Sequence, residues 1–287
     1  MHNVRKVARM ISMQCSVWPR KPIFLLGLLL GVNFAFAPTF NFGRAALSIG
    51  ASAQVFEPYI LMASEAYICL PLTLGLLLML SDAPFTSEHI SCVGLRVTRV
   101  QWVAAQCLYV LISCVVYQAV ILAFTLLLTA GNGYVGNVWS TALLRIAKDM
   151  NFGSRYALSF SHPQFLARYA PHQALAISFA LQTAYGFVLS MAMFFLNLMF
   201  HRGVGIAAAL LLHQLGYIFI RDGAMFTNQF LSLMAHALAA RHAHLPGGGM
   251  PTLAQSAAVL AAASLALVFL SLLRANRVDF LVPGRNV

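Results

Sequence analysis

The sequence predicts an all-α membrane protein with six transmembrane helices, on three observations. Of the 287 residues, 60% are hydrophobic and only 9% are charged, and the mean hydropathy is +0.79. Soluble domains carry about 25% charged residues, so a soluble class does not fit. Several apolar runs reach the roughly 20 residues that a helix needs to cross a bilayer core. We expect an N-terminal interfacial helix within residues 1–21 and a transmembrane domain over residues 22–287.

The N-terminal segment is predicted to be a basic amphipathic helix that lies flat on the membrane. Its apolar residues recur at steps of three and four, which defines one helical face. They are Val4, Val7, Ala8, Ile11, Cys15 and Trp18. Basic residues lie off this face, and a terminal tryptophan suits the membrane interface. The alternative is a charged tail that only sets the topology.

The apolar runs place the six spans near residues 22–40, 60–80, 103–129, 174–200, 205–220 and 253–273. In the connection after the third span, Trp139, Leu143, Ile146 and Met150 repeat at helical spacing. This repeat predicts a short helix on the membrane surface, with Asn137 as its N-cap.

The distribution of Lys and Arg predicts that both termini are cytosolic and that the protein is a multi-pass protein of the cell membrane. With this orientation 11 of the 18 basic residues face the cytosol and 7 face outward. The net charge is +11, and the basic residues that produce it lie beside apolar runs rather than on one polar face. Membrane lipids with anionic headgroups, and not nucleic acid, are therefore the expected partners of this charge.

The sequence carries no motif that predicts a catalytic residue, a cofactor site or a metal site. It has neither a Gly-x-x-x-x-Gly-Lys-Ser/Thr loop nor a His-Glu-x-x-His pair, so we expect the chain not to bind ATP itself. None of the five cysteines falls in a predicted outer loop, which argues against a disulfide framework. His236, His242 and His244 are interpreted as a solvated or headgroup-level cluster.

Glu65 is the one carboxylate well inside a predicted span, and an ionisable group at that depth is a functional hypothesis. It predicts a translocation path with polar residues of neighbouring spans. The candidates are Glu65, Thr73, Gln106, Ser113 and Tyr117. Alternatively, Glu65 lies near the outer interface and reaches headgroups or water. Two other functions stay open: a membrane-embedded enzyme, and an ion-coupled carrier that uses Glu65.

The connection between the second and third spans predicts a surface for a soluble partner. Ile90, Val93, Val97 and Val100 give it a helix with one apolar face. The charged residues point away from that face. The alternative is an ordinary interfacial helix without a partner.

With Leu80–Phe85 and Arg96–Arg99 before Trp102, this layout resembles the membrane subunits of type-2 ABC exporters. The resemblance is greatest to small bacterial permeases without a fused ATPase. It implies a permease subunit that exports a lipid-like or amphipathic substrate together with separate ABC ATPase subunits, which hydrolyse the ATP, and a second permease copy. The coupling role falls on Asp82, Pro84, Phe85, Glu88, His89, Arg96 and Arg99. The contact between the two copies falls on Gly27 and Gly31.

Overall fold

The computed structural model describes residues 2–84, 98–200, 203–221, 229–242 and 250–275. Within these residues, five helices are long and apolar enough to cross a membrane. They are α2 (Pro22–Ser48), α6 (Arg99–Thr129), α10 (Pro171–Met199), α11 (Val204–Arg221) and α12 (Leu253–Ala275). A sixth span is present if the bent pair α3 (Glu57–Ser64) and α4 (Ala66–Met79) counts as one. As predicted, the chain is helical, and its long apolar helices agree with a multi-pass membrane protein.

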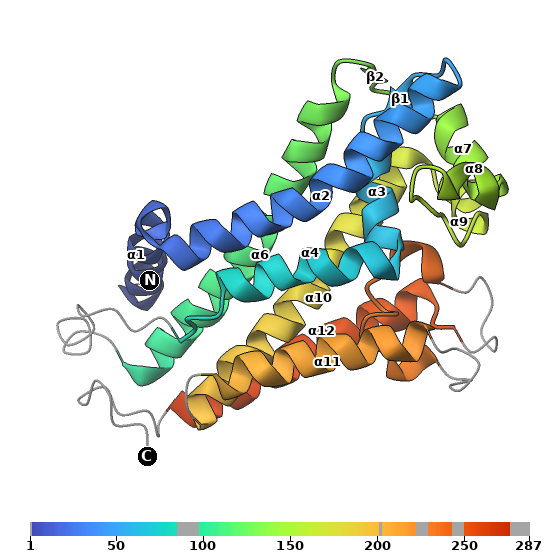
Figure 1. Ribbon diagram of the computed structural model, residues 1–287. Coiled ribbons are helices and arrows are strands. Elements are labelled where there is room, and N and C mark those ends of the chain that lie inside the picture. Colours follow the sequence, from blue (N-terminus) through green and yellow to red (C-terminus); the bar gives the residue numbers. More distant parts are fainter. Residues whose placement is uncertain (1, 85–97, 201–202, 222–228, 243–249, 276–287) are drawn as a thin grey trace.

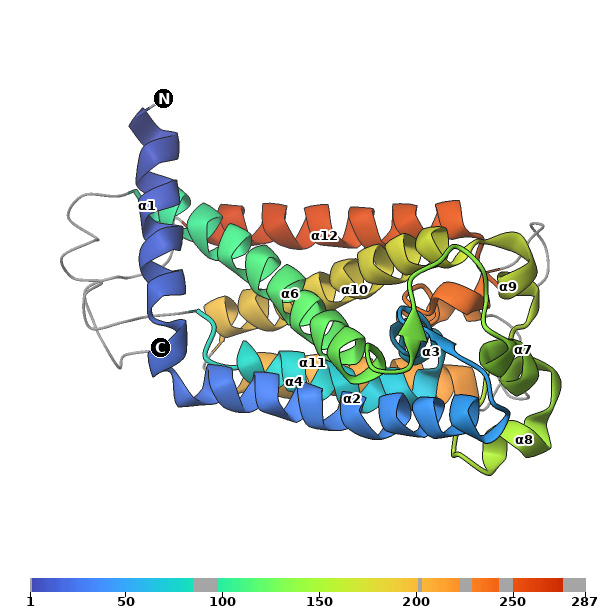
Figure 2. The same cartoon turned by 90° about the horizontal axis from the view of Figure 1, so that it is seen from above.

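The long helices run side by side, and the short elements gather at the two ends of the bundle (Figure 1). At one end, α1 (His2–Ser16) and the 3-10 helix η1 (Trp18–Arg20) lie across the bundle rather than along it (Figure 2). A helix at this angle lies along the membrane surface when the bundle spans the bilayer, which suits the predicted interfacial role.

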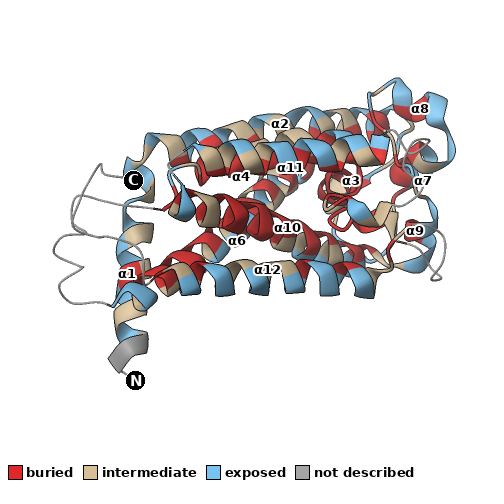
Figure 3. Ribbon diagram, turned by 90° about the horizontal axis from the view of Figure 1, so that it is seen from below, coloured by how far each residue is buried: buried red, intermediate tan, exposed pale blue. Residues whose placement is uncertain are grey.

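Helix α10 forms the centre of the bundle, and the surrounding helices cover it (Figure 3). In its most apolar stretch 72% of the residues are buried, against 28% for α2 and 17% for α12. The central position explains the polar residues of α10, because they contact other helices rather than lipid. Helices α2 and α12 instead expose large apolar side chains such as Leu29 and Leu265.

Helix α2 is longer than the predicted 22–40 span, since it continues through Pro38 to Ser48. Proline lacks the N–H that a helix interior needs, but membrane helices tolerate it where nearby groups bond to the freed backbone. In the next turn position, the hydroxyl of Thr39 donates to the carbonyl of Ala35 at 2.7 Å, so this polar side chain is partnered inside the helix.

Helices α2 and α4 approach each other at their backbones. A Cβ on Gly27 would lie 2.5 Å from the backbone nitrogen of Met79, and one on Gly75 would lie 2.8 Å from the carbonyl oxygen of Gly27. A Cβ on Gly31 would overlap the hydroxyl of Tyr117. The expected contact of Gly27 and Gly31 with a second copy stays a prediction. Their close approach occurs within the chain, because Gly75 and Tyr117 occupy the space opposite them.

The connection between α6 and α10, residues 130–170, is attached to the end of the bundle. Strands β1 (Ala53–Gln54) and β2 (Gly133–Tyr134) pair in parallel, with Ala53 opposite Gly133. Beside them, the backbone N–H of Ser140 donates to one carboxylate oxygen of Glu57 at 2.5 Å, and its hydroxyl donates to the other. These contacts fix the start of the connection on α3.

The predicted surface helix is present, but it is divided and has a different N-cap. It consists of α7 (Thr141–Lys148) and α8 (Met150–Ser154), and α9 (Gln164–Arg168) follows. Ser140 caps α7 by accepting from the N–H of Leu143 at 3.2 Å. The prediction of Asn137 was wrong, because its amide oxygen instead accepts from the N–H of His172 at 3.2 Å. Asp149 divides the helix, since its carboxylate caps α8.

Candidate functional site

The span predicted as continuous over residues 60–80 is broken at Glu65, where α3 and α4 meet at 94°. Glu65 has an extended backbone, with φ −107° and ψ 122°. Its buried carboxylate accepts from the N–H of Ser161 at 2.6 Å and from the hydroxyl of Ser161 at 3.0 Å. A buried carboxylate without hydrogen-bond donors is costly. The break turns Glu65 toward the donors of the connection between α6 and α10, and the prediction of a straight span was wrong for this reason.

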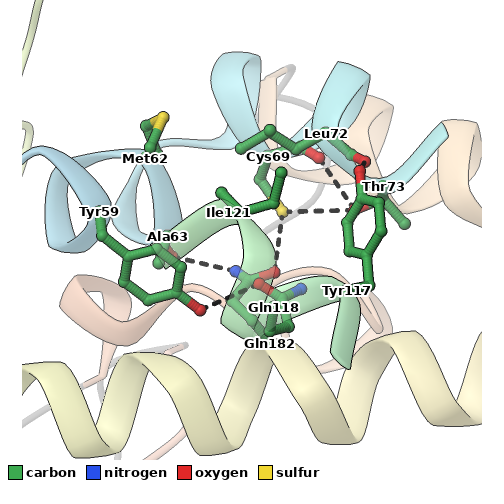
Figure 4. A pocket seen from close by; sticks show the side chains of 10 residues that line it. All are labelled: Tyr59, Met62, Ala63, Cys69, Leu72, Thr73, Tyr117, Gln118, Ile121 and Gln182. Atoms are coloured by element: carbon green, nitrogen blue, oxygen red, sulfur yellow. Dashed lines mark hydrogen bonds between the residues drawn. The ribbon is translucent and has the colours of Figure 1, made fainter. Parts of the chain in front are cut away.

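A cavity lies in the bundle next to this break, between α3, α4, α6 and α10 (Figure 4). The free space inside it admits water rather than a large molecule. Its lining residues are Tyr59, Met62, Ala63, Cys69, Leu72, Thr73, Tyr117, Gln118, Ile121 and Gln182. None of these residues carries a formal charge at neutral pH. The cavity is therefore lined by neutral polar and apolar groups.

Gln182 of α10 connects three separate segments around the cavity. Its amide nitrogen donates to the carbonyl of Ala63 at 3.1 Å and to that of Ala237 at 3.3 Å. Its amide oxygen accepts from the thiol of Cys69 at 3.4 Å. The carbonyl of Ala63 lies in the last turn of α3, where a helix leaves its carbonyls without internal partners. Gln182 therefore caps the broken helix and joins it to α4 and to the segment after α11.

Two further hydrogen bonds close the cavity on the side of α6. The hydroxyl of Tyr59 donates to the amide oxygen of Gln118 at 2.9 Å. The hydroxyl of Tyr117 donates to the carbonyl of Leu72 at 2.5 Å, one residue before Thr73. These bonds join both halves of the broken span to α6, so a tilt of α6 must break them or carry the two halves along.

The lining groups suit the binding of a neutral polar group better than a reaction. Cys69 is the one thiol among them, and its neighbours are the hydroxyl of Thr73 and the amide of Gln182. Neither of these groups is a base that could take a proton from the thiol, as nucleophilic catalysis needs. In the described part of the chain, the cavity thus offers hydroxyl and amide groups for recognition.

The structure distributes the predicted path residues over three places. Thr73 and Tyr117 line the cavity, whereas Glu65 is held by Ser161 at the helix break. Gln106 and Ser113 are fully buried on α6 but do not line this cavity. Gln106 has no hydrogen-bond partner for either polar side-chain atom among the described residues. Of the five predicted path residues, only Thr73 and Tyr117 therefore meet at the cavity.

Three of the predicted coupling residues are described, and they lie at the end of the bundle where α1 crosses. Asp82 is exposed and attracts Lys21, while Pro84 is buried. Arg99 is exposed in the first turn of α6. The other predicted coupling residues, Phe85, Glu88, His89 and Arg96, lie outside the described residues.

His236 is not solvated, contrary to the sequence-based interpretation. Its side chain is 1% exposed. Its Nε2 pairs with the carbonyl of Phe230 at 3.0 Å, and its Nδ1 pairs with the hydroxyl of Ser256 at 2.9 Å. A carbonyl can only accept, so Nε2 carries the proton and Nδ1 accepts from Ser256. This histidine holds the segment after α11 against α12.

Sequence reasoning missed Gln118, Gln182 and Asn197, which make the main hydrogen bonds between helices. A signal for them exists, because an amide inside an apolar run needs a partner in the membrane. Their partners include backbone carbonyls of segments far away in the sequence, which no local pattern indicates.

No match was found when the chain was compared with known protein families, with curated protein sequences and with solved structures.

Proposed function

We propose that this chain is the membrane-spanning permease subunit of an ATP-driven ABC exporter. It works with separate ATPase subunits and a second permease copy, and its substrate is lipid-like or amphipathic. The observation that carries the proposal is the attachment of the connection between α4 and α6, the predicted coupling element. The described residues on both sides of this connection are joined to other helices.

Before the connection, Asn197 of α10 joins the end of α4 to the start of α11. Its buried amide nitrogen donates to the carbonyl of Ala83 at 2.7 Å. Its amide oxygen accepts from the N–H of Gly205 at 2.9 Å. A force on residues 85–97 would pass through Ala83 to α10 and α11 together.

After the connection, a capping box fixes the start of α6. The hydroxyl of Thr98 accepts from the N–H of Gln101 at 3.3 Å, and the side chain of Gln101 accepts from the N–H of Thr98 at 3.2 Å. Further along α6, the indole N–H of Trp18 donates to the hydroxyl of Tyr109 at 2.6 Å. Trp18 also stacks on Phe24 of α2, with ring centroids 4.8 Å apart. The same force would therefore move α6 together with α1 and α2.

In the proposed mechanism, ATP-driven closure of the ATPases displaces the connection and tilts α4 and α6. These two helices supply Cys69, Thr73, Tyr117 and Gln118 to the cavity of Figure 4. Their movement relative to α10 opens the cavity, which as described is too small for a substrate. Its hydroxyl and amide groups suit an uncharged polar head, and its apolar residues suit a hydrocarbon part.

The two alternative functions have less support from the geometry. An ion-coupled carrier needs an exchangeable acid in its path, but both carboxylate oxygens of Glu65 accept from Ser161. A membrane-embedded enzyme needs an activated nucleophile, but no base lies beside Cys69 among the residues that line the cavity.

The proposal is tested by replacing Asn197 with alanine in the complex reconstituted with its ATPase. We expect the variant to keep its ATPase subunit but to transport several-fold less substrate per ATP hydrolysed. The matched control is Asn137→Ala, which removes an asparagine hydrogen bond at the opposite end of the bundle. Unchanged coupling in Asn197→Ala, or an equal loss in Asn137→Ala, would show that this attachment does not transmit the force.

A further inference from the structure

We propose that His162, His242 and Met250 form a binding site for a soft monovalent metal ion, Cu(I), at the outer end of the fold. The three side chains line one cavity. Helix α9 and the 3-10 helix η3 (Ala239–Arg241) pack together at this place (Figure 1). This cavity shares no lining residue with that of Figure 4, so the site is separate from the proposed path.

The hydrogen bond of His242 fixes which ring nitrogen is available to a ligand. Its Nδ1 lies 2.9 Å from the carbonyl oxygen of Ala239. Because a carbonyl only accepts, Nδ1 carries the proton and Nε2 keeps its lone pair. This Nε2 is buried and has no hydrogen-bond partner among the described residues. An imidazole held through its other nitrogen by a carbonyl is the arrangement typical of metal-binding histidines.

His162 brings a second buried ring nitrogen to the same cavity. Its Nε2 also has no hydrogen-bond partner in the described part of the chain. Burial and the nearby charge of Arg241 lower the pKa of His162 to about 4, and burial lowers the pKa of His242. Both rings are therefore neutral at pH 7, as metal ligation requires. Buried polar atoms are normally partnered, and the proposed ion is the partner that these two nitrogens lack.

The third lining residue and the local charge decide which ion fits. The thioether of Met250 favours a soft ion such as Cu(I), which imidazole also binds. Arg241 repels cations at this place, and the repulsion of a monovalent ion is half that of a divalent one. Its charge is partly offset, since Glu65 attracts Arg241. Among the described residues no three His, Cys, Asp or Glu side chains converge, so the usual ligand set of a zinc site is not formed.

The test is an anaerobic Cu(I) titration of the purified full chain against a chromogenic Cu(I) chelator. We expect one Cu(I) per chain and weaker binding of Zn(II). His162→Gln and His242→Gln should each lower the affinity by more than about 100-fold, since even the loss of an outer-shell partner costs 10- to 100-fold. Met250→Leu should lower it less. His172→Gln, at an exposed histidine outside the cavity, should leave it unchanged.

Thermal unfolding of the metal-free variants checks that they are folded, and X-ray absorption of the Cu(I)-loaded wild type must show both nitrogen and sulfur ligands. The proposal is overturned if the wild type binds no Cu(I), if the double histidine variant binds it equally well, or if sulfur is missing from the spectrum. The titration needs neither ATPase nor substrate, so its failure leaves the proposed transport function untouched.

Discussion

Replacing Gln182 with leucine tests whether this residue holds the broken span in place. Leucine has a similar size, so the packing of α10 changes little. The substitution removes the hydrogen bonds to the carbonyls of Ala63 and Ala237 and the acceptor for the thiol of Cys69. The expected effect is therefore a loss of polar contacts rather than a new cavity.

The magnitude follows from the two carbonyl bonds. Hydrogen bonds between membrane helices are worth about 0.6 kcal/mol on average and about 1.7 kcal/mol at most. A buried acceptor left unpaired costs about 1–3 kcal/mol when water cannot reach it. The cavity beside Gln182 admits water, which can hydrogen-bond to the two freed carbonyls. The values for hydrogen bonds between membrane helices therefore apply, rather than the larger cost of unpaired acceptors. We expect Gln182→Leu to destabilise this region by about 1–3 kcal/mol in total.

The assay measures the rate at which a maleimide modifies Cys69, in a variant whose other four cysteines are replaced. Cys69 is 2% exposed, so modification reports the opening of the helix break. A loss of 1–3 kcal/mol predicts labelling about 5- to 150-fold faster, since about 1.4 kcal/mol is a factor of ten. The control Gln173→Leu makes the same change at an exposed position of α10. Labelling of Gln182→Leu at the wild-type rate would refute the role of Gln182.

Three further predictions concern topology, packing and pH. A cysteine at Asn132 should react with an impermeant reagent on intact cells, and one at Ser87 only after permeabilisation; the reverse pattern would invert the predicted orientation. Gly31→Ala should cost about 1–3 kcal/mol of stability in detergent unfolding, because the new methyl group overlaps Tyr117. An unchanged free energy of unfolding would mean that Gly31 of α2 and Tyr117 of α6 lie further apart than the structure shows. In metal-free protein, His162 takes up a proton below about pH 6.5 when unfolded but only below about pH 4 when folded. The free energy of unfolding should therefore fall as the pH drops from about 6.5 to about 4. In the His162→Gln variant this fall should be smaller.

The fold class and most helix positions were predictable, because they depend on local patterns. Apolar runs of membrane length and a face at helical spacing need no knowledge of distant residues. The break at Glu65 was not predictable in this way. The donors of its carboxylate come from Ser161, 96 residues further along the chain. The position of Glu65 inside an apolar run indicates that its carboxylate needs hydrogen-bond donors, but it does not indicate which distant residue supplies them.

In the candidate site, too, local patterns were predictable and the contacts between distant residues were not. Two glycines four residues apart permit a close helix approach, but the spacing does not specify whether the partner is another helix of the chain or a second copy. In the structure, Gly27 and Gly31 face α4 and Tyr117. Thr73 and Tyr117 were predicted as path residues and do line the cavity. Gln182 was missed because one of its partners, Ala237, lies in a segment assigned to an outer loop.

The most direct test of the proposed function is co-purification of the ATPase subunit with a variant in which Glu88, Arg96 and Arg99 are replaced by alanine. The coupling role predicts that these charges face a soluble partner, and solvent-facing charges contribute less than about 1 kcal/mol to stability, so expression and folding should stay near those of the wild type. Interface charges govern association, so the variant should lose the ATPase or uncouple ATP hydrolysis from transport. A variant that keeps the ATPase and transports as well as the wild type would contradict the coupling role of this connection.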